Sequence, residues 1–384
     1  MRFHLMQTGV VGRRHEIEQG MAGQRKDLYQ RFLEEVKGYV QLADDLGYAS
    51  YAQPEHHLQI EGFEANNHPG MFSLFVGLHS KRMKASAMGY TLPTHNPLRV
   101  AEEIATLDHM LKGRLNVAFT RGYHARWVDA YAAVPGVQCT RPANAKAKDD
   151  QDAFNRSVFE ESIQIIKKAW LSETFSFHGK HWNFPPPGGS DGHPAYAKFG
   201  KGQDAEGRVR EVGIAPRCYQ DPHPRIFGGF AGTMRTVDMW ARENGTPIVL
   251  ADDLEFCKNL ADRWYDGARE AGHEPDRGDS IAWGGFLMLT SDKERQKQLM
   301  DEHMWFWDEW FIPMGQRPPN VLIGSADEII DRIGEAHDKL GFNDLFLMFG
   351  QGHLEPDENN HELTEFMAKI APRFSQKDEE GTFV

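Results

Sequence analysis

Cysteine is scarce in this sequence. The chain holds three cysteines in 384 residues, widely separated at Cys139, Cys218 and Cys257 and without a CxxC pair. An odd, scattered set neither builds a disulfide framework nor supplies the paired thiolates of a zinc site. We therefore expect a protein of the reducing cytoplasm that contains no metal.

Long apolar runs and basic clusters are missing as well. No stretch approaches the roughly 20 apolar residues of a membrane span, and the opening MRFHLMQTG reads as a strand, not as a secretory signal. The net charge is −13, and the lysines and arginines are dispersed along the chain. Nucleic-acid binding needs a basic face. The composition therefore argues against both nucleic acid and membrane as partners.

Three common site motifs are absent from the sequence. No GxGxxG follows the first apolar run, no GKS or GKT occurs, and no pair of histidines has the HExxH spacing. These absences argue against a Rossmann dinucleotide site, a P-loop and a zinc hydrolase, respectively. A metal-dependent barrel hydrolase, which the 18 histidines could suggest, ranks last among the alternatives because no ligand spacing supports it.

What the sequence does contain is an alternation of short apolar runs with longer amphipathic stretches. Apolar residues at helical spacing in 27–46 illustrate the amphipathic type. We predict strands over 2–7, 48–53, 84–90, 114–120, 225–229, 247–251, 281–289 and 344–349. We predict helices over 27–46, 70–80, 97–111, 158–171, 233–244, 254–271, 326–340 and 357–370. Eight strand–helix units favour a closed (β/α)₈ TIM barrel over an open doubly wound sheet. The same pattern is compatible with nine or ten strands.

Two segments interrupt this repeat within what we predict to be a single domain spanning residues 1–384. Residues from about 179 to 224 are rich in proline and glycine, which is typical of a functional loop insertion. Residues from about 301 to 319 read DEHMWFWDEWFIPMGQRPP, an unusually aromatic stretch. Either segment could cover a dry cavity, and the aromatic one could equally serve helix packing or a subunit interface.

The ends of the predicted strands carry the candidate site residues, because the reactive groups of a TIM barrel come from these positions. Glu55-His56-His57 follows the second strand and could supply an acid–base histidine; the alternative is a pair of solvated loop histidines. Met88-Gly89 ends the third strand, where the glycine would let backbone approach a flat ligand. The alternative there is a tight turn before a helix.

Two further positions suit an anionic ligand. Arg121 and Tyr123 follow the fourth strand, where the arginine could grip a phosphate and the tyrosine could contact a ring. Arg121 could equally be a surface residue in a salt bridge. After the fifth strand, Gly232, Thr233 and Thr236 open a helix, whose free N–H groups and hydroxyls form a ready anion site. The alternative for Thr233 is ordinary helix capping.

These positions together resemble the bacterial luciferase-like flavin monooxygenase family over nearly the whole chain. The resemblance rests on EHH at 55–57, on LPTHNPLRVAEEIATLDHMLKGRLNVAFTRGY at 92–123, on AGTMRT at 231–236 and on the block IGSADEIIDRI…GFNDLFLMF. The block at 92–123 is the most specific, because strand, turn, helix and arginine agree over its length. AGTMRT is the loosest match.

The resemblance implies a barrel that uses reduced FMN and O₂ to oxygenate a small organic substrate. A separate flavin reductase would supply the reduced FMN, and the protein would form a homodimer. His56 matches the family's active-site histidine, and Met88-Gly89 matches a bulge, often a cis peptide, against the flavin ring. Arg121, Thr233 and Thr236 match its phosphate contacts.

Two other functions stay open at this point. A deazaflavin-dependent oxidoreductase shares this barrel and much of its patterning. A flavin-binding protein without turnover would need only the phosphate grip and the ring shelf. Substrate identity is beyond the sequence, which indicates a modest-sized organic molecule with some polarity.

Overall fold

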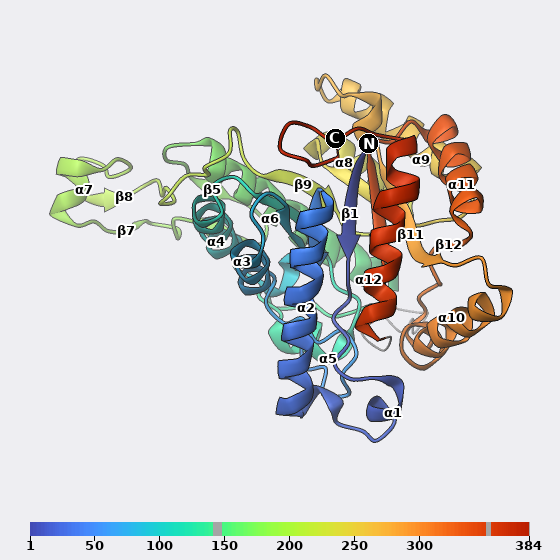
Figure 1. The fold of residues 1–384 in the computed structure, drawn as a ribbon. Coiled ribbons are helices and arrows are strands. Elements are labelled where there is room, and N and C mark those ends of the chain that lie inside the picture. Colours follow the sequence, from blue (N-terminus) through green and yellow to red (C-terminus); the bar gives the residue numbers. More distant parts are fainter. Residues whose placement is uncertain (141–147, 351–354, 384) are drawn as a thin grey trace. The chain divides into compact units, whose positions relative to one another are not determined.

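Eight strands form the closed ring of a TIM barrel, as the sequence predicts (Figure 1). The computed structural model describes residues 1–140, 148–350 and 355–383. Around the ring the strands follow the order β10-β9-β4-β3-β2-β1-β13-β11, and a pairing of β10 with β11 closes it. Their bounds are β1 (Arg2–Met6), β2 (Ser50–Gln53), β3 (Lys84–Thr91), β4 (Leu115–Thr120), β9 (Arg225–Gly228), β10 (Thr246–Val249), β11 (Ala282–Leu289) and β13 (Asp344–Met348).

A ninth strand, β12 (Val321–Gly324), pairs in parallel with the second half of β11. The predicted elements do not include it. Its four residues follow a Pro-Pro-Asn turn sequence, and a run of only three apolar residues, 321–323, is too short to give a clear strand pattern. The eight-strand ring and the additional strand together give the count of nine that the pattern allowed.

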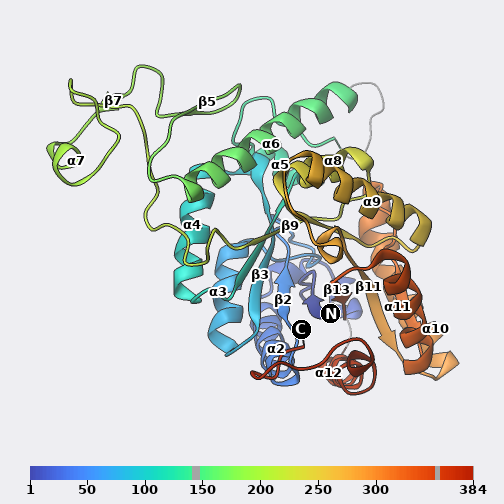
Figure 2. The same cartoon turned by 90° about the horizontal axis from the view of Figure 1, so that it is seen from above.

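Helices surround the ring (Figure 2). They include α2 (Lys26–Leu46), α3 (Pro69–His79), α8 (Met234–Glu243), α9 (Leu254–Glu270), α11 (Ala326–Leu340) and α12 (Pro356–Glu365). Phe32, Val36, Tyr39 and Ala43 of α2 are buried, as their helical spacing predicts. The helix ends at Gly47, which adopts the left-handed conformation with φ 96°. The Tyr39 hydroxyl accepts a 3.0 Å hydrogen bond from Asn359, which joins α2 to α12.

The chain divides into two compact units. The first comprises 1–89, 114–118 and 225–384 and contains the ring strands except the last two residues of β3 and of β4. The second comprises 90–113 and 119–224, with α4 (Pro97–Met110), α5 (Ala125–Tyr131) and α6 (Lys148–Leu171). Within it, the Trp170 indole donates a 3.1 Å hydrogen bond to the Ala101 carbonyl, which joins α6 to α4.

The helix α6 begins at Lys148, whereas the sequence predicts a start at 158. The prediction missed the first turns because they are polar and show no apolar periodicity. The proline-rich segment 179–224 is largely loop, as expected, but contains short elements. These are the two-residue strands β6 (Asn183–Phe184), β7 (Ser190–Asp191) and β8 (Arg208–Val209) and the helix α7 (Pro194–Phe199). β6 pairs with β5 (Phe177–His178), and β7 pairs with β8.

The aromatic segment belongs to the first unit and is helical rather than loop-like. α10 (Lys293–Phe306) continues into a π-helical turn (Trp307–Phe311) and a short 3₁₀ turn (Ile312–Met314). Phe63 packs against this segment, with ring centroids 5.4 Å from Phe306 and 4.9 Å from Trp310. The short helix α1 (Arg14–Ile17) also lies in this unit.

Ring contacts identify the inner face of the barrel. Phe227 of β9 makes edge contacts with His4 of β1 and Phe346 of β13, at 6.0 and 5.4 Å. Since β9 neighbours neither β1 nor β13 in the ring, these three side chains meet inside the barrel. Residues two positions further along each of these strands also point into the barrel, because alternate residues of a strand share a face.

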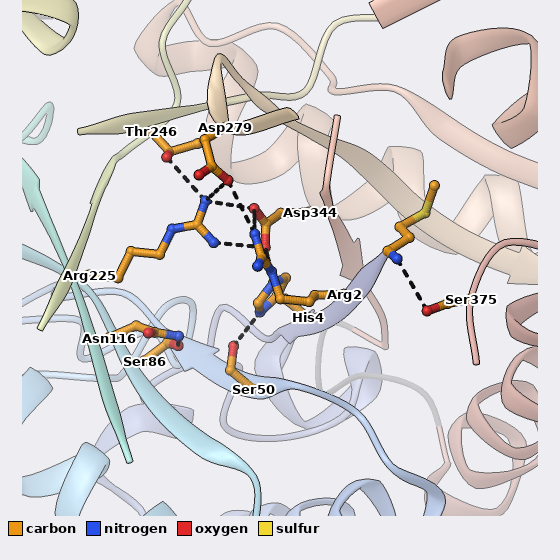
Figure 3. Close-up of polar contacts among 11 residues, drawn as sticks. Arg2, His4, Ser50, Ser86, Asn116, Arg225, Thr246, Asp279, Asp344 and Ser375 are labelled. Atoms are coloured by element: carbon orange, nitrogen blue, oxygen red, sulfur yellow. Dashed lines mark hydrogen bonds and ion pairs between the residues drawn. The ribbon is translucent and has the colours of Figure 1, made fainter. Parts of the chain in front are cut away.

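An ionic network fills the N-terminal end of the barrel (Figure 3). The fully buried Asp344 carboxylate accepts hydrogen bonds from Arg2 at 2.7 Å, from His4 at 2.8 Å and from Arg225 at 2.7 Å. His4 also lies 2.8 Å from the Ser50 hydroxyl. Burial alone would raise the pKa of Asp344, but the charge of Arg225 and the hydrogen bonds from His4 and Arg2 hold it well below its usual value.

Candidate active site

The C-terminal end of β2 places His56 in the first unit, where its side chain is 8% exposed. Its Nδ1 lies 3.4 Å from Oε1 of Glu64, and its backbone N–H donates to the Asn66 carbonyl at 2.7 Å. Glu64 is buried and has φ 50°, in the left-handed region. The Glu64 carboxylate is therefore close enough to interact electrostatically with His56 Nδ1.

Glu64 also connects His56 to the aromatic segment. Trp310 Nε1 donates a 2.8 Å hydrogen bond to Glu64 Oε2, while Glu64 Oε1 faces His56. The orientation of His56 therefore depends also on Trp310, which lies 246 positions from Glu64 in the sequence. Neither Glu64 nor Trp310 is among the site residues that we predict from the sequence.

The rest of the EHH motif is paired within itself. His57 Nε2 lies 2.9 Å from Oε1 of the buried Glu55. His56 is buried and His57 is partly exposed, so the alternative of a solvated loop histidine does not hold for His56. His56 also lines a cavity of about 240 Å³ together with Tyr29, Gln59 and Asn67, among others.

The Met88–Gly89 peptide at the end of β3 is cis, the geometry that the family resemblance implied. Gly89 has a structural reason to be glycine: a Cβ there would lie 2.2 Å from the Ala118 carbonyl oxygen of β4. The close backbone approach is therefore to the neighbouring strand. Contact of this peptide with a flavin ring stays a prediction.

Arg121 lies in the second unit and is ion-paired there. Its Nη1 is 2.5 Å from Oδ1 of Asp152 on α6, and both side chains are about one third exposed. The salt bridge that we considered as the alternative for Arg121 is thus present. Tyr123 is half-buried in the same unit. Their contact with a phosphate or a ring stays a prediction.

Thr233 begins α8 in the first unit. Its hydroxyl accepts from the Thr236 backbone N–H at 3.3 Å and lies 3.0 Å from the Thr236 hydroxyl. Thr233 therefore caps the helix, which is the alternative that the sequence left open. Capping does not occupy the site, because Thr233 is exposed. No described atom lies within 4 Å of where a Gly232 Cβ would stand. Anion binding at this helix end stays a prediction.

Asn66 is a further polar residue that we do not predict from the sequence. It is fully buried, and neither its Oδ1 nor its Nδ2 has a hydrogen-bond partner among the described residues. Its amide lies against Gly9, beyond the C-terminal end of β1, where a Cβ would come within 2.4 Å of the amide oxygen. An unpaired buried amide lowers the stability of the fold unless a ligand completes its hydrogen bonds.

These features fit the flavin that the resemblance implies. The open N-terminus of α8, with two hydroxyls, suits a phosphate. Among the described residues, no group of three or more His, Cys, Asp or Glu is placed to hold a metal ion. None of the described helices is long and apolar enough to cross a membrane.

The comparisons with known proteins agree with this fold and these motifs. Residues 6–344 match the model of the luciferase-like monooxygenase family. The chain belongs to that family. It is 24% identical over 286 residues to 3,6-diketocamphane 1,6-monooxygenase of Pseudomonas putida, covering 73% of this chain and 70% of that protein. It is 21% identical over 383 residues to the oxygenase component of flavin-dependent trigonelline monooxygenase of Acinetobacter baylyi, covering 92% and 91%.

Solved structures share the barrel. The oxygenating constituent of 3,6-diketocamphane monooxygenase from Pseudomonas putida, in complex with FMN, superposes with a TM-score of 0.71 at 19% identity, covering 97% of this chain and 98% of the other. An F420-dependent secondary alcohol dehydrogenase superposes with a TM-score of 0.61 at 13% identity, covering 96% and 98%. At these identities the likeness shows the fold alone.

Proposed function

We propose that this protein is the oxygenase component of a two-component, FMN-dependent monooxygenase. The family match over residues 6–344 carries the proposal, since it covers most of the barrel. A relative that is an oxygenase component and a neighbour with bound FMN support it. When bound, reduced FMN supplies the electrons that allow one oxygen atom of O₂ to enter the substrate and the other to leave as water.

The phosphate of FMN would be held by Arg121 and by the hydroxyls and N–H groups that open α8 at Thr233 and Thr236. Arg121 is paired with Asp152, so a bound phosphate would share or replace that carboxylate. Met88, Gly89 and Tyr123 would contact the ring, and Gly232 leaves room for backbone approach. A homodimer is the assembly that the resemblance implies.

His56 would hold or transfer a proton at its Nε2, with Glu64 fixing the ring from the Nδ1 side. Trp310 in turn fixes Glu64. The aromatic residues around Phe63 and Trp310 keep the surroundings of this pair apolar, which helps to exclude water. Exclusion of water matters because it prevents loss of reducing equivalents as hydrogen peroxide.

The test is flavin binding followed by coupled turnover. Purified protein should bind FMN more tightly than riboflavin, and Arg121→Ala should weaken FMN binding about tenfold while leaving riboflavin binding unchanged, because only FMN has the phosphate. With a supplied reductase, a panel of substrates should show substrate-dependent oxygen uptake. Failure to bind FMN in either redox state would refute the proposal.

A deazaflavin-dependent oxidoreductase is the second candidate, favoured by the F420-dependent structural neighbour. The absorbance of the cofactor taken up from a mixture of FMN and F420 separates the two. Binding of FMN without any oxygen uptake over the substrate panel would instead indicate a flavin-binding protein without turnover.

A further inference from the structure

One cavity of the first unit lies beside His56. It has a volume of about 240 Å³, and its lining residues all lie between positions 23 and 67. They come from the 3₁₀ turn at Ala22–Gln24, from the start of α2 and from the loop that follows β2. Because these segments follow β1 and β2 in the chain, the cavity lies at the C-terminal end of the barrel.

Three of the lining residues carry side chains that can hold water. They are Tyr29, Gln59 and Asn67, and the hydroxyl and the two amides can each donate and accept hydrogen bonds. A buried water molecule needs a few such groups and roughly 15 Å³ of cavity volume. A cavity of about 240 Å³ with this lining can therefore hold a chain of several water molecules.

The cavity also reaches the surface of the protein. Leu58 and Ile60 line it and are 43% and 36% exposed, and Asn67 is exposed as well. The His56 side chain, by contrast, is only 8% exposed. The cavity therefore leads from the surface to a histidine that is itself buried.

Among the described residues, the Glu64 side of His56 offers no comparable way to the solvent. The Glu64 side chain is 2% exposed, with Oε1 facing His56 and Oε2 accepting the Trp310 N–H. The Trp310 ring stacks on the buried Phe63 at 4.9 Å. A proton that His56 passed to Glu64 would therefore lie beside an indole that only donates and a ring without polar atoms, neither of which can carry it onward.

We propose that His56 exchanges its proton with the solvent through this cavity, along water held by Tyr29, Gln59 and Asn67. The inference rests on the proposed function, in which His56 holds or transfers a proton, and it adds the route by which that proton is returned. A histidine that acts as acid or base in every cycle has to regain its starting protonation state. The solvent supplies or removes the proton, so no further reactant is needed.

The test varies the size of one side chain at the mouth of the cavity. Ile60→Ala widens the mouth and Ile60→Trp narrows it, and circular dichroism checks that both variants are folded. The first readout is the reaction of His56 with diethyl pyrocarbonate on flavin-free protein, followed by mass spectrometry. A neutral ring nitrogen attacks a carbonyl carbon of the reagent, and the new N–C bond replaces a C–O bond as carbon dioxide and ethanol leave.

The reaction of His56 should follow the size of residue 60. Ile60→Trp should slow it about tenfold relative to wild type, because the reagent has to pass a narrower mouth, and Ile60→Ala should speed it. His57 serves as the internal reference, since it is paired with Glu55 and is not among the residues that line the cavity. Its rate should be the same in all three proteins.

The second readout follows the proton itself. On flavin-free protein with isotope-labelled histidine, NMR measures how fast the ring N–H of His56 exchanges with water, and the Ile60 variants should rank in the same order. Tyr29→Phe keeps the ring and removes the hydroxyl, so it should leave the diethyl pyrocarbonate rate unchanged and slow the N–H exchange about threefold. An unchanged exchange rate in Tyr29→Phe would overturn the assignment of this hydroxyl to the route.

Ile312 supplies the matched control. It is an isoleucine of similar exposure, 41%, at the start of the 3₁₀ turn that follows Trp310. It does not line the cavity, so Ile312→Ala and Ile312→Trp should leave both rates of His56 unchanged. Rates that follow the size of residue 312 instead of residue 60 would place the route at the aromatic segment and overturn the proposal.

The proton route and the proposed function fail separately. Equal rates for His56 in wild type, Ile60→Ala and Ile60→Trp would overturn the route, whether or not FMN binds. Failure to bind FMN, together with rates that follow the size of residue 60, would overturn the proposed function and leave the route standing.

Discussion

The two ends of this barrel differ in how their buried polar groups are paired, although the buried Ser280 hydroxyl before β11, at the N-terminal end, also has no partner among the described residues. At the N-terminal end, Asp344 is surrounded by Arg2, His4 and Arg225, and each of these side chains donates to it at 2.7–2.8 Å. At the C-terminal end, the buried polar atoms of Asn66, His303 and Trp307 have no partner in the described part of the chain. A satisfied network stabilises the fold. Barrels of this type bind their ligands at the C-terminal end, which is also the end where we propose that FMN binds.

The largest effect should come from removing the centre of the satisfied network. Asp344→Ala leaves two arginines without their buried carboxylate and should lower the free energy of unfolding by about 3–5 kcal/mol. Urea denaturation at pH 7 measures the change. The folded pKa of Asp344 lies below its ordinary value of 3.8, so wild type should lose this contribution as pH falls below that value, and the variant should not. A loss below 1 kcal/mol would show that the network does not stabilise the barrel.

At the opposite end, replacing an unsatisfied group should stabilise the protein in acid. The folded pKa of His303 is about 4, below the ordinary 6.5, so the unfolded chain takes up a proton that the folded chain does not. Wild type should therefore lose stability as pH falls from 6.5 to 4, by up to about 3 kcal/mol. His303→Phe should flatten this decline. An identical pH dependence of the urea midpoint in both proteins would contradict the prediction.

His56→Ala tests the function of the C-terminal end with little effect on the fold. Product formation should fall by about a hundredfold, while hydrogen peroxide release per NADH consumed rises. Glu64→Gln should act in the same direction but less strongly, because it weakens the positioning of His56 and keeps its shape. Oxygen uptake and peroxide assays measure both. Unchanged coupling in His56→Ala would refute the role of this histidine.

The smallest effect compares two helix caps. Thr233 caps α8 and Ser325 caps α11, each accepting from a backbone N–H three residues on. Alanine at either position should cost about 1 kcal/mol of stability. Only Thr233→Ala should also weaken FMN binding, since only α8 opens onto the proposed phosphate site. Equal FMN affinities in the two variants would mean that Thr233 is a cap and nothing more.

The fold was largely predictable because its elements carry local signals. The eight ring strands and their main helices were placed to within a few residues, since apolar runs and helical periodicity depend on neighbouring residues. The first turns of α6 were missed because they are polar. The strand β12 was missed because its apolar run, 321–323, is only three residues long. The π-helical end of the aromatic segment was missed for a different reason: its aromatic density indicates burial without indicating a period.

The site was predictable only in part. His56, Gly89 and Thr233 stand at strand ends, where the architecture itself points to them. Glu64 and Trp310 belong to no motif, and the contact of Glu64 with both His56 and Trp310 comes from tertiary packing. The Arg121–Asp152 pair likewise joins residues 31 positions apart. No spacing in the sequence signals such contacts.

The sequence by itself determined the strand–helix order, the barrel and the family, because periodicity and turn residues act over short stretches of chain. Only the tertiary structure decided which buried polar groups are paired and which are not. That distinction depends on side chains that folding brings together from distant positions in the sequence, because a buried hydrogen bond forms only where both partners meet.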